Sequence, residues 1–429
     1  MKKLSVSLLM SVLITIISFA QTAQSVINEK EVQRIETVLS ADSMEGRKAF
    51  TRGSEKAANF ISNEFKKIGL ETLNGEKSYK QIFRIVSPEI LSISASFDGR
   101  SVDPDRLIAF TCQPDLTITA ASGFKKVYIQ KASELSKRFS DFIQLKENLL
   151  VFIDDSLAKN FTRLSKRKQY LFKSDKSIVF VLGNFNADHF LIKAKHEIKE
   201  DQASNVIGVL PGKSKKNELI IFSAHYDHLG IKKGENKDSV YNGANDDASG
   251  VTAVIALAKY YKAAKNNELT LIFAAFTAEE TGGYGSQYFS GQIDAEKVIA
   301  MFNIEMIGTE SKWGKSSAYI TGFEKTDMGN ILQKNLQGSN FSFHSDPYPD
   351  QDLFYRSDNA TLARLGVAAH TISTSKMDNE PNYHKLSDEI ETLDISNMTQ
   401  IIRSIIISAK SIISGRDTPT RVNADELTR

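Results

Sequence analysis

Histidine and acidic residues in this sequence repeatedly occur just after short apolar segments. The residues with this placement are His225, Asp227, Glu279, Glu280 and Glu305. Imidazole nitrogens and carboxylate oxygens are ligands that zinc binds in proteins. The pattern therefore indicates a zinc site, provided that the fold brings these residues together.

The apolar segments have the length and composition of buried β-strands. Segments 219–224, 269–276 and 298–303 are short apolar runs, and helical patterns separate them along the chain. This alternation predicts an α/β fold, a three-layer sandwich whose central mixed, largely parallel sheet is covered by helices on both faces. Ligands of open α/β sheets bind outside the carboxyl ends of the strands, which is where the acidic clusters lie.

Two further groups extend the candidate site. Asp246 and Asp247 precede a helical pattern that begins near Val251, and His384 lies in a loop after the predicted strand 368–373. A two-metal hydrolytic site requires about five ligands, one of them a carboxylate that can bridge ions about 3.5–4 Å apart. The chain offers such a set: His225, Asp246, Glu280, Glu305 and His384.

Each cluster also has a simpler explanation. Asp246 and Asp247 can cap the helix that follows them, and His225 can be an ordinary surface histidine. Glu279 and Glu280 can belong to a surface turn, although adjacent side chains point in different directions and can take different tasks. The repetition of the pattern at several strand ends favours the metal site over these separate explanations.

Residues 1–20 have the features of a secretory signal peptide. Lys2 and Lys3 precede an apolar stretch that ends in the small-residue pattern Ser18-Phe19-Ala20. We therefore expect cleavage after this pattern, export to the periplasm or the medium, and no membrane span in the mature chain. A membrane anchor is the alternative for the same stretch.

The balance of charged residues and the cysteine content limit which partners and which covalent cross-links the chain can have. The 429 residues include 54 Lys+Arg and 52 Asp+Glu, and removal of the signal peptide brings these numbers into balance. The mature chain therefore has no excess of basic residues that would indicate nucleic acid as a partner. Cys112 is the sole cysteine, so no internal disulfide forms and the core must hold the fold. The sequence does not determine the oligomeric state.

The residue pattern between positions 76 and 200 differs from that of the rest of the chain. This region has short β-type runs among basic polar segments, which is typical of an inserted subdomain. We predict that residues 21–75 and 201–415 form the catalytic domain and that 76–200 form the insertion, a lid or a protease-associated-like module. Residues 416–429 are predicted to be a frayed polar tail.

The order of these motifs resembles a family of zinc-dependent exopeptidases, peptidase family M28, which includes bacterial extracellular aminopeptidases, glutamate carboxypeptidase and the glutaminyl cyclases. The resemblance covers residues 40–72 and 203–413 and is weaker at Glu45-Gly46-Arg47 and Arg356-Ser357-Asp358. Its specific strings are Ala224-His225-Tyr226-Asp227-His228, Gly243-Ala244-Asn245-Asp246-Asp247-Ala248-Ser249-Gly250, Ala278-Glu279-Glu280, Asn303-Ile304-Glu305-Met306-Ile307-Gly308 and Tyr383-His384.

The resemblance implies a role for each site residue. Asp246 bridges two zinc ions, of which Glu280 and His384 complete one site and His225 and Glu305 the other. Glu279 is the general base, and Tyr383 donates a hydrogen bond to the developing oxyanion. Asp227 accepts a hydrogen bond from the second ring nitrogen of His225, the one that does not bind zinc. His228 is a neighbour of the pocket and not a ligand. The peptide bond between Asp246 and Asp247 is expected to be cis.

These roles imply an exported di-zinc aminopeptidase that removes N-terminal residues from peptides. The sequence departs from the family pattern at Glu305, where relatives commonly have Asp, and at Asn359, where they have His. Two other functions stay open. One is a glutaminyl cyclase with a single zinc on the same fold. The other is a non-catalytic binding protein on this fold, although such proteins lose metal ligands and this chain keeps a candidate at all five positions.

Overall fold

A computed structural model of the chain describes residues 25–143, 146–165, 170–185, 188–234 and 238–427. The predicted signal peptide lies outside the described residues. The chain divides into two compact units: the first contains the chain up to Ile82 and residues Ser204–Leu427, and the second contains Phe83–Ala203. Strands β2 (Lys80–Phe97) and β10 (Phe190–Leu210) have residues in both units.

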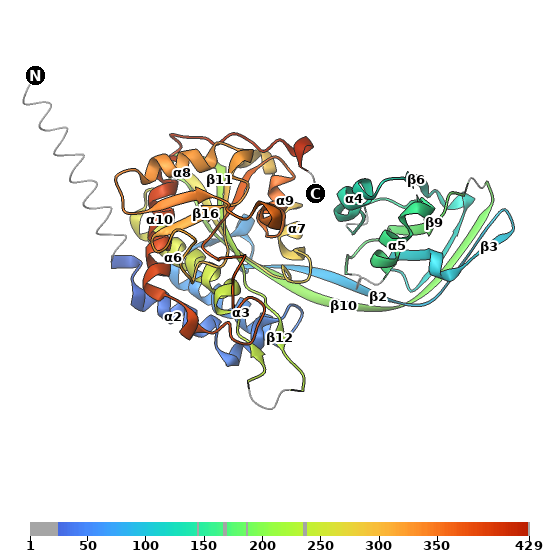
Figure 1. The fold of residues 1–429 in the computed structure, drawn as a ribbon, viewed down its shortest axis with the longest axis horizontal. Coiled ribbons are helices and arrows are strands. Elements are labelled where there is room, and N and C mark those ends of the chain that lie inside the picture. Colours follow the sequence, from blue (N-terminus) through green and yellow to red (C-terminus); the bar gives the residue numbers. More distant parts are fainter. Residues whose placement is uncertain (1–24, 144–145, 166–169, 186–187, 235–237, 428–429) are drawn as a thin grey trace, which may run out of the picture. The chain divides into compact units, whose positions relative to one another are not determined.

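Four parallel strands form the centre of the first unit (Figure 1). They are β11 (Lys215–His225), β14 (Leu269–Phe276), β15 (Val298–Ile304) and β18 (Ala368–Ser373), in the spatial order β18-β15-β11-β14. β10 pairs antiparallel with β14, and β16 (Ser317–Ile320) pairs antiparallel with β18 and parallel with β17 (Ser342–Ser345). These pairings confirm the prediction of a mixed, largely parallel sheet. The prediction succeeds because strands that are buried on both faces are unbroken apolar runs in the sequence.

Helices cover both faces of this sheet. Ile220 and Phe222 of β11 point to a core shared with α2 (Glu29–Leu39), α3 (Arg52–Ile68), α6 (Ser249–Ala264), α8 (Met328–Leu336) and α10 (Ile395–Ile413). Ile221, between them, points to a second core with α7 (Tyr284–Ser290) and α9 (Asn359–Ala363). Alternate strand residues thus hold opposite layers together, and α2, α6 and α10 lie side by side in Figure 1.

A side-chain cap sets the start of the last long helix. α10 begins at Ile395 because the Asp394 side chain caps it and accepts the backbone N–H of Asn397 at 2.9 Å. Residues 390–392 form a separate 3₁₀ turn. A local capping interaction therefore decides where this helix starts.

The C-terminal tail is packed, which corrects the expectation that it is frayed. Val422 and Leu427 are buried in the core beside α9, and the Val422 N–H donates to the Gly366 carbonyl at 3.0 Å. Two apolar residues in an otherwise polar segment are thus enough to anchor it. None of the described helices is both long and apolar enough to cross a membrane.

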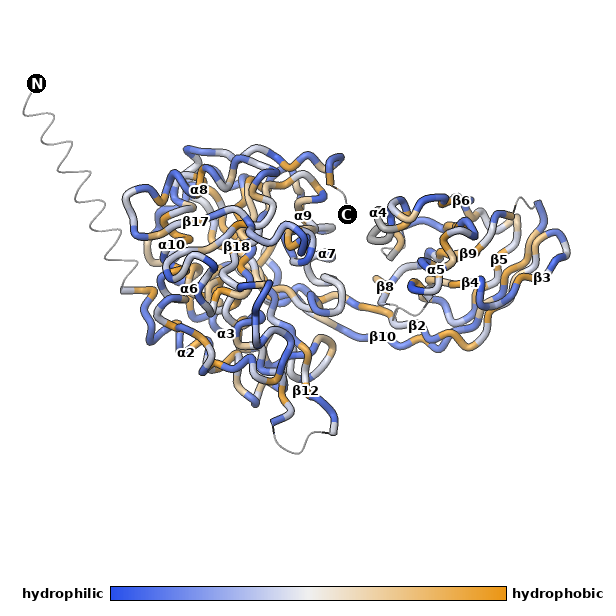
Figure 2. Tube along the Cα trace, in the orientation of Figure 1, coloured by the Kyte–Doolittle hydropathy of each residue, from blue (hydrophilic) through white to orange (hydrophobic). Residues whose placement is uncertain are grey.

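The second unit has its own sheet and core. β4 (Leu107–Thr111), β9 (Ser177–Leu182), β7 (Leu149–Ile153) and β6 (Lys125–Ile129) form a sheet in that order, with α4 (Ala132–Ile143) and α5 (Ala158–Ser165) in the same unit. From Phe190 to Glu197, residues of β10 alternate between buried and exposed. Figure 2 shows hydrophobic and hydrophilic residues interspersed along this strand. This period of two is that of a strand with one face on a core.

A buried carboxyl group lies between α2 and α6 in the first unit. Glu36 is fully buried, and its Oε2 accepts a hydrogen bond from the Thr252 hydroxyl at 2.7 Å, while its Oε1 has no hydrogen-bond partner in the described part of the chain. Burial raises the pKa of Glu36 from an ordinary value of 4.5 to about 8. The neutral form is therefore favoured in the folded state.

Replacing Glu36 with glutamine is expected to make the free energy of unfolding less dependent on pH. The folded pKa of Glu36 is raised, so its contribution to stability is complete below pH 4.5 and is lost as the pH rises through about 8. Glu36→Gln should match the wild type near pH 4.5 and exceed it by about 4 kcal/mol at pH 8. Urea unfolding of the metal-free chain at both pH values measures this difference.

Glu64→Gln is the matched control. Despite partial burial, Arg34 and Lys67 hold the pKa of Glu64 below its ordinary value, so this variant should lose stability near neutral pH. A Glu36→Gln variant with the same pH dependence as the wild type would show that Glu36 is ionised at no unusual cost.

Candidate metal site

The candidate site lies at the carboxyl ends of three neighbouring parallel strands. β11 ends at His225, β14 is followed by Glu279 and Glu280, and β15 is followed by Glu305. Because β11 pairs with both β14 and β15 in parallel, these ends meet at one edge of the sheet. The structure therefore brings together the residues that the sequence placed after separate apolar runs.

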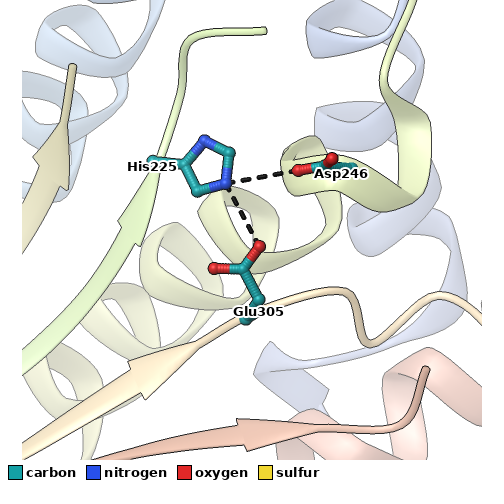
Figure 3. A group of neighbouring side chains, drawn as sticks. All are labelled: His225, Asp246 and Glu305. Atoms are coloured by element: carbon teal, nitrogen blue, oxygen red, sulfur yellow. Dashed lines mark hydrogen bonds and ion pairs between the residues drawn. The ribbon is translucent and has the colours of Figure 1, made fainter. Parts of the chain in front are cut away.

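One ligand group combines β11, the start of α6 and β15 (Figure 3). His225 Nε2 lies 3.3 Å from Asp246 Oδ1 and 3.2 Å from Glu305 Oε1. His225 and Asp246 are buried, and the Glu305 side chain is 18% exposed. An imidazole nitrogen and two carboxylate oxygens within this distance can hold one metal ion.

A second ligand group shares Asp246. His384 Nε2 lies 3.2 Å from both Asp246 Oδ2 and Glu280 Oε2. His228, which sequence reasoning placed outside the ligand set, has its Nδ1 2.9 Å from Glu280 Oε1 and 3.8 Å from Asp246 Oδ2. Two imidazoles therefore compete for the same pair of carboxylates, and only the fold shows this.

The electrostatics of both groups favour a cation. Burial alone would lower the pKa of His225, but the carboxylates of Glu305 and Asp246 overcome it and hold that pKa well above its ordinary value. Burial also opposes the rise at His384, whose neighbours Asp246 and Glu280 nevertheless raise its pKa to about 10. A site that stabilises positive charge on its own histidines suits divalent metal ions, and its nitrogen and oxygen donors fit zinc.

The shared ligand Asp246 is held by its backbone. Asp388, four residues after His384, accepts the N–H groups of Asn245 and Asp246 at 2.8 and 3.0 Å. Asp247 accepts the N–H groups of Gly250, Met306 and His225 at 3.0–3.2 Å, so it caps α6 and also ties two strand ends together. The peptide bond between Asp246 and Asp247 is cis, as the family resemblance implied.

Arg47 is a positioning residue that sequence analysis matched only weakly. Its guanidinium is completely buried and donates to the carbonyls of Tyr226 and Gly243 at 2.8 Å and to those of Leu39 and Asn242. Tyr226 separates His225 from Asp227, and Gly243 precedes the Asp246 loop. Arg47 therefore joins the two segments that carry these site residues.

The role of Asp227 differs from the expected support of His225. His225 Nδ1 lies 3.1 Å from the backbone carbonyl of Asp227, whereas the Asp227 carboxylate is 3.8 Å away. That carboxylate instead accepts the backbone N–H of Glu279 at 3.0 Å, and burial raises its pKa to about 7. Asp227 thus orients His225 through its carbonyl and Glu279 through its side chain.

Glu279 and Tyr383 line the same pocket as the ligand groups. Burial raises the pKa of Glu279 well above its ordinary value, which suits a carboxylate that takes up and releases protons. The Tyr383 ring stacks on the His384 ring at a centroid distance of 3.9 Å, and burial keeps its hydroxyl protonated by raising its pKa. The phenol is therefore available as a hydrogen-bond donor.

Glu305 and Asn359, the two residues that depart from the family pattern, are both held by hydrogen bonds. Glu305 Oε2 accepts a hydrogen bond from the Ser357 hydroxyl at 2.6 Å, which anchors the longer side chain while Oε1 faces His225. Asn359, at the start of α9, donates to the Phe354 carbonyl and accepts from Thr371. Asn359 is buried and fixes the loop before α9, so it takes part in packing and not in ligand binding.

Replacing His384 should weaken zinc binding more than replacing His228. Nε2 of His384 is equidistant from the two carboxylates, whereas His228 lies close to Glu280 alone. We expect His228→Ala to lower the affinity of one site about 10–100-fold, as loss of an outer partner does, and His384→Ala to lower it further. Zinc titration against a competing chelator measures both, and the reverse order would make His228 the ligand.

The fold and the donor set define a mixed α/β protein with a carboxylate- and imidazole-lined pocket at the ends of parallel strands. Residues 205–408 match the model of Peptidase family M28, which confirms the resemblance inferred from the motifs. Residues 205–408, slightly less than half of the chain, are therefore similar to this family. A solved aminopeptidase from Aneurinibacillus sp. strain AM-1 has the same fold, with a TM-score of 0.54 and 17% identity over 91% of this chain and 95% of that one.

Curated relatives show similarity over different lengths. A leucine aminopeptidase 1 of Metarhizium robertsii is 24% identical over 316 residues, covering 67% of this chain and 76% of the relative. A probable zinc metalloprotease of Pyricularia oryzae is 33% identical over 113 residues, 25% of this chain and 22% of that protein. The chain spans about a quarter of the length of this and several other relatives.

Proposed function

We propose that this protein is an exported di-zinc aminopeptidase that hydrolyses N-terminal residues from peptides. The observation that carries the proposal is the convergence of two ligand groups on Asp246, with the carboxylate of Glu279 in the same pocket. The names of the relatives, a probable zinc metalloprotease and a leucine aminopeptidase among them, support the same activity. Export rests on the features of residues 1–20 in the sequence.

The five ligands have a natural division. His225 and Glu305 would hold one zinc, Glu280 and His384 the other, and Asp246 both, since each of its oxygens faces a different group. When bound, zinc supplies a Lewis acid that polarises a carbonyl and lowers the pKa of water. The protein residues contribute orientation, proton transfer and hydrogen bonding around that chemistry.

Glu279 would act as the general base and then as the general acid. Its carboxylate takes a proton from water as the water oxygen attacks the peptide carbonyl carbon, and delivers that proton to the leaving amine when the C–N bond breaks. The hydrogen bond from its backbone to Asp227 fixes the start of this side chain. The Tyr383 hydroxyl would donate a hydrogen bond to the carbonyl oxygen as negative charge develops there.

The pocket also suits the free amino group that an aminopeptidase recognises. Four carboxylates line it, those of Asp246, Glu279, Glu280 and Glu305. A protonated amino terminus is attracted by such a lining, whereas an acetylated one has no charge to offer. The proposal therefore predicts hydrolysis of peptides with a free N-terminus and not of their N-acetylated forms.

The direct test is incubation of the purified protein with amino-acid anilides, free peptides, N-acetylated peptides and N-terminal glutaminyl peptides. Mass spectrometry distinguishes uptake of water at the first peptide bond from loss of ammonia, which would indicate the glutaminyl cyclase reaction. Activity should vanish on treatment with a chelator and return with zinc. Cleavage of acetylated peptides, or activity that survives removal of zinc, would overturn the proposal.

A further inference from the structure

Arg356 is a cationic side chain in a pocket lined mainly by carboxylates. It lines the pocket together with Glu279, Glu305 and Tyr383, and apolar lining comes from Leu353 among others. The carboxylates of the proposed metal site attract the positively charged amino terminus of a peptide. Arg356, in contrast, attracts a negatively charged group within the same pocket. An arginine there offers five N–H donors in a planar fork that matches a carboxylate.

No carboxylate of the described residues pairs with Arg356. Nη1 donates to the side-chain oxygen of Gln351 at 3.2 Å and approaches its backbone carbonyl at 3.5 Å, and both acceptors are neutral. By comparison, Arg34 and Arg84 both contact glutamates directly. The positive charge of Arg356 is therefore available to a ligand in the pocket.

The backbone around Arg356 is held in place. Its N–H donates to the Leu353 carbonyl at 3.1 Å, and the next residue, Ser357, donates to Glu305 Oε2 at 2.6 Å. Arg356 thus extends from a fixed point of the backbone beside one proposed ligand, in the pocket that Tyr383 also lines.

We propose that Arg356 binds a carboxylate of the substrate, which makes the protein selective for peptides that carry a carboxylate next to the scissile bond. This inference rests on the proposed peptidase function and names its substrate class. Two positions supply such a group: the side chain of an N-terminal Asp, or the C-terminal carboxylate of a dipeptide. The guanidinium forms the same contact before and during bond cleavage, so its main effect is on KM.

Three matched dipeptides separate the two positions. Asn-Ala amide has neither carboxylate, Asp-Ala amide has only the side-chain group, and Asn-Ala free acid has only the C-terminal one. For the zinc-loaded full chain, kcat/KM should be about tenfold or more higher for one charged peptide than for Asn-Ala amide. Arg356→Met should reduce this ratio to near one, mostly through KM.

Further variants make the test specific to the guanidinium. Arg356→Lys should retain part of the ratio, because lysine keeps the charge but not the fork, and Arg356→Glu should bring it below one. Arg416→Met is the control, since Arg416 is an exposed arginine whose side chain, among the residues that the structure describes, bonds only to Ser414. This control should leave all three substrates unaffected, and thermal unfolding of each variant confirms that it is folded.

A binding measurement separates failure of this inference from failure of the proposed function. Calorimetry of the same peptides with a Glu279→Gln background reports the charge preference without turnover. One outcome would contradict only the hydrolytic function: the wild type cleaves none of the peptides but binds the charged form more tightly, and Arg356→Met loses this preference. In that case the role of Arg356 in binding a carboxylate stands. Equal kcat/KM for all three peptides, or a ratio that persists in Arg356→Met, would overturn the inference.

Discussion

Replacing Glu279 with glutamine is expected to lower kcat about 10²–10⁴-fold while zinc content and fold stay those of the wild type. The amide has nearly the same shape as the carboxylate but cannot accept a proton from water. Burial raises the pKa of Glu279 well above its ordinary value, which favours uptake of a proton by this carboxylate. Activity on a leucine anilide and zinc content by atomic absorption measure the two effects.

Glu280→Gln is the matched comparison, because it changes the adjacent carboxylate in the same loop. Glu280 contacts His228 and His384, so its loss should reduce zinc content as well as activity. The contrast between the two variants separates proton transfer from metal binding. A Glu279→Gln enzyme that cleaves the anilide at a rate near that of the wild type would remove Glu279 as the base.

Replacing Arg47 with methionine is expected to destabilise the metal-free chain by about 3–5 kcal/mol. The substitution removes the guanidinium donor from four buried carbonyls. A buried carbonyl left without any donor costs about 1–3 kcal/mol, although the Gly243 carbonyl keeps the Ala248 N–H at 3.2 Å and relaxation recovers part of the loss. Two of these carbonyls belong to Asn242 and Gly243, which lead to Asp246, so zinc affinity should fall as well. Urea unfolding without zinc and titration with zinc measure the two losses separately.

Arg34→Met provides the control for loss of an arginine. Arg34 forms ion pairs with Glu31 and Glu64, but its side chain is 41% exposed, so its removal should cost less than about 1 kcal/mol. Arg47→Lys tests the fork, since lysine cannot reach several separate carbonyls at once. If Arg47→Met is as stable as Arg34→Met, water replaces the guanidinium and Arg47 does not organise the site.

The core strands and the motifs that follow them were predictable because their signals are local. Strands β14 and β18 have the predicted bounds, His225 is the last residue of β11, and Glu280 and Glu305 follow the ends of β14 and β15. An unbroken apolar run identifies a strand buried on both faces, and parallel order places the strand ends at one edge. Fold class and the location of the candidate site therefore required no knowledge of contacts.

The partners of the site residues depended on tertiary structure. Asp388 holds Asp246 across 142 positions, Arg47 reaches Gly243 across 196, and the Asp227 carboxylate bonds to Glu279 and not to His225. No pattern in composition or spacing marks these pairs, because a buried polar group takes whichever donor or acceptor the packing brings near it. Residue type and local period determine which side chains arrive at the strand ends, but the three-dimensional packing of distant segments decides which hydrogen bond each one makes.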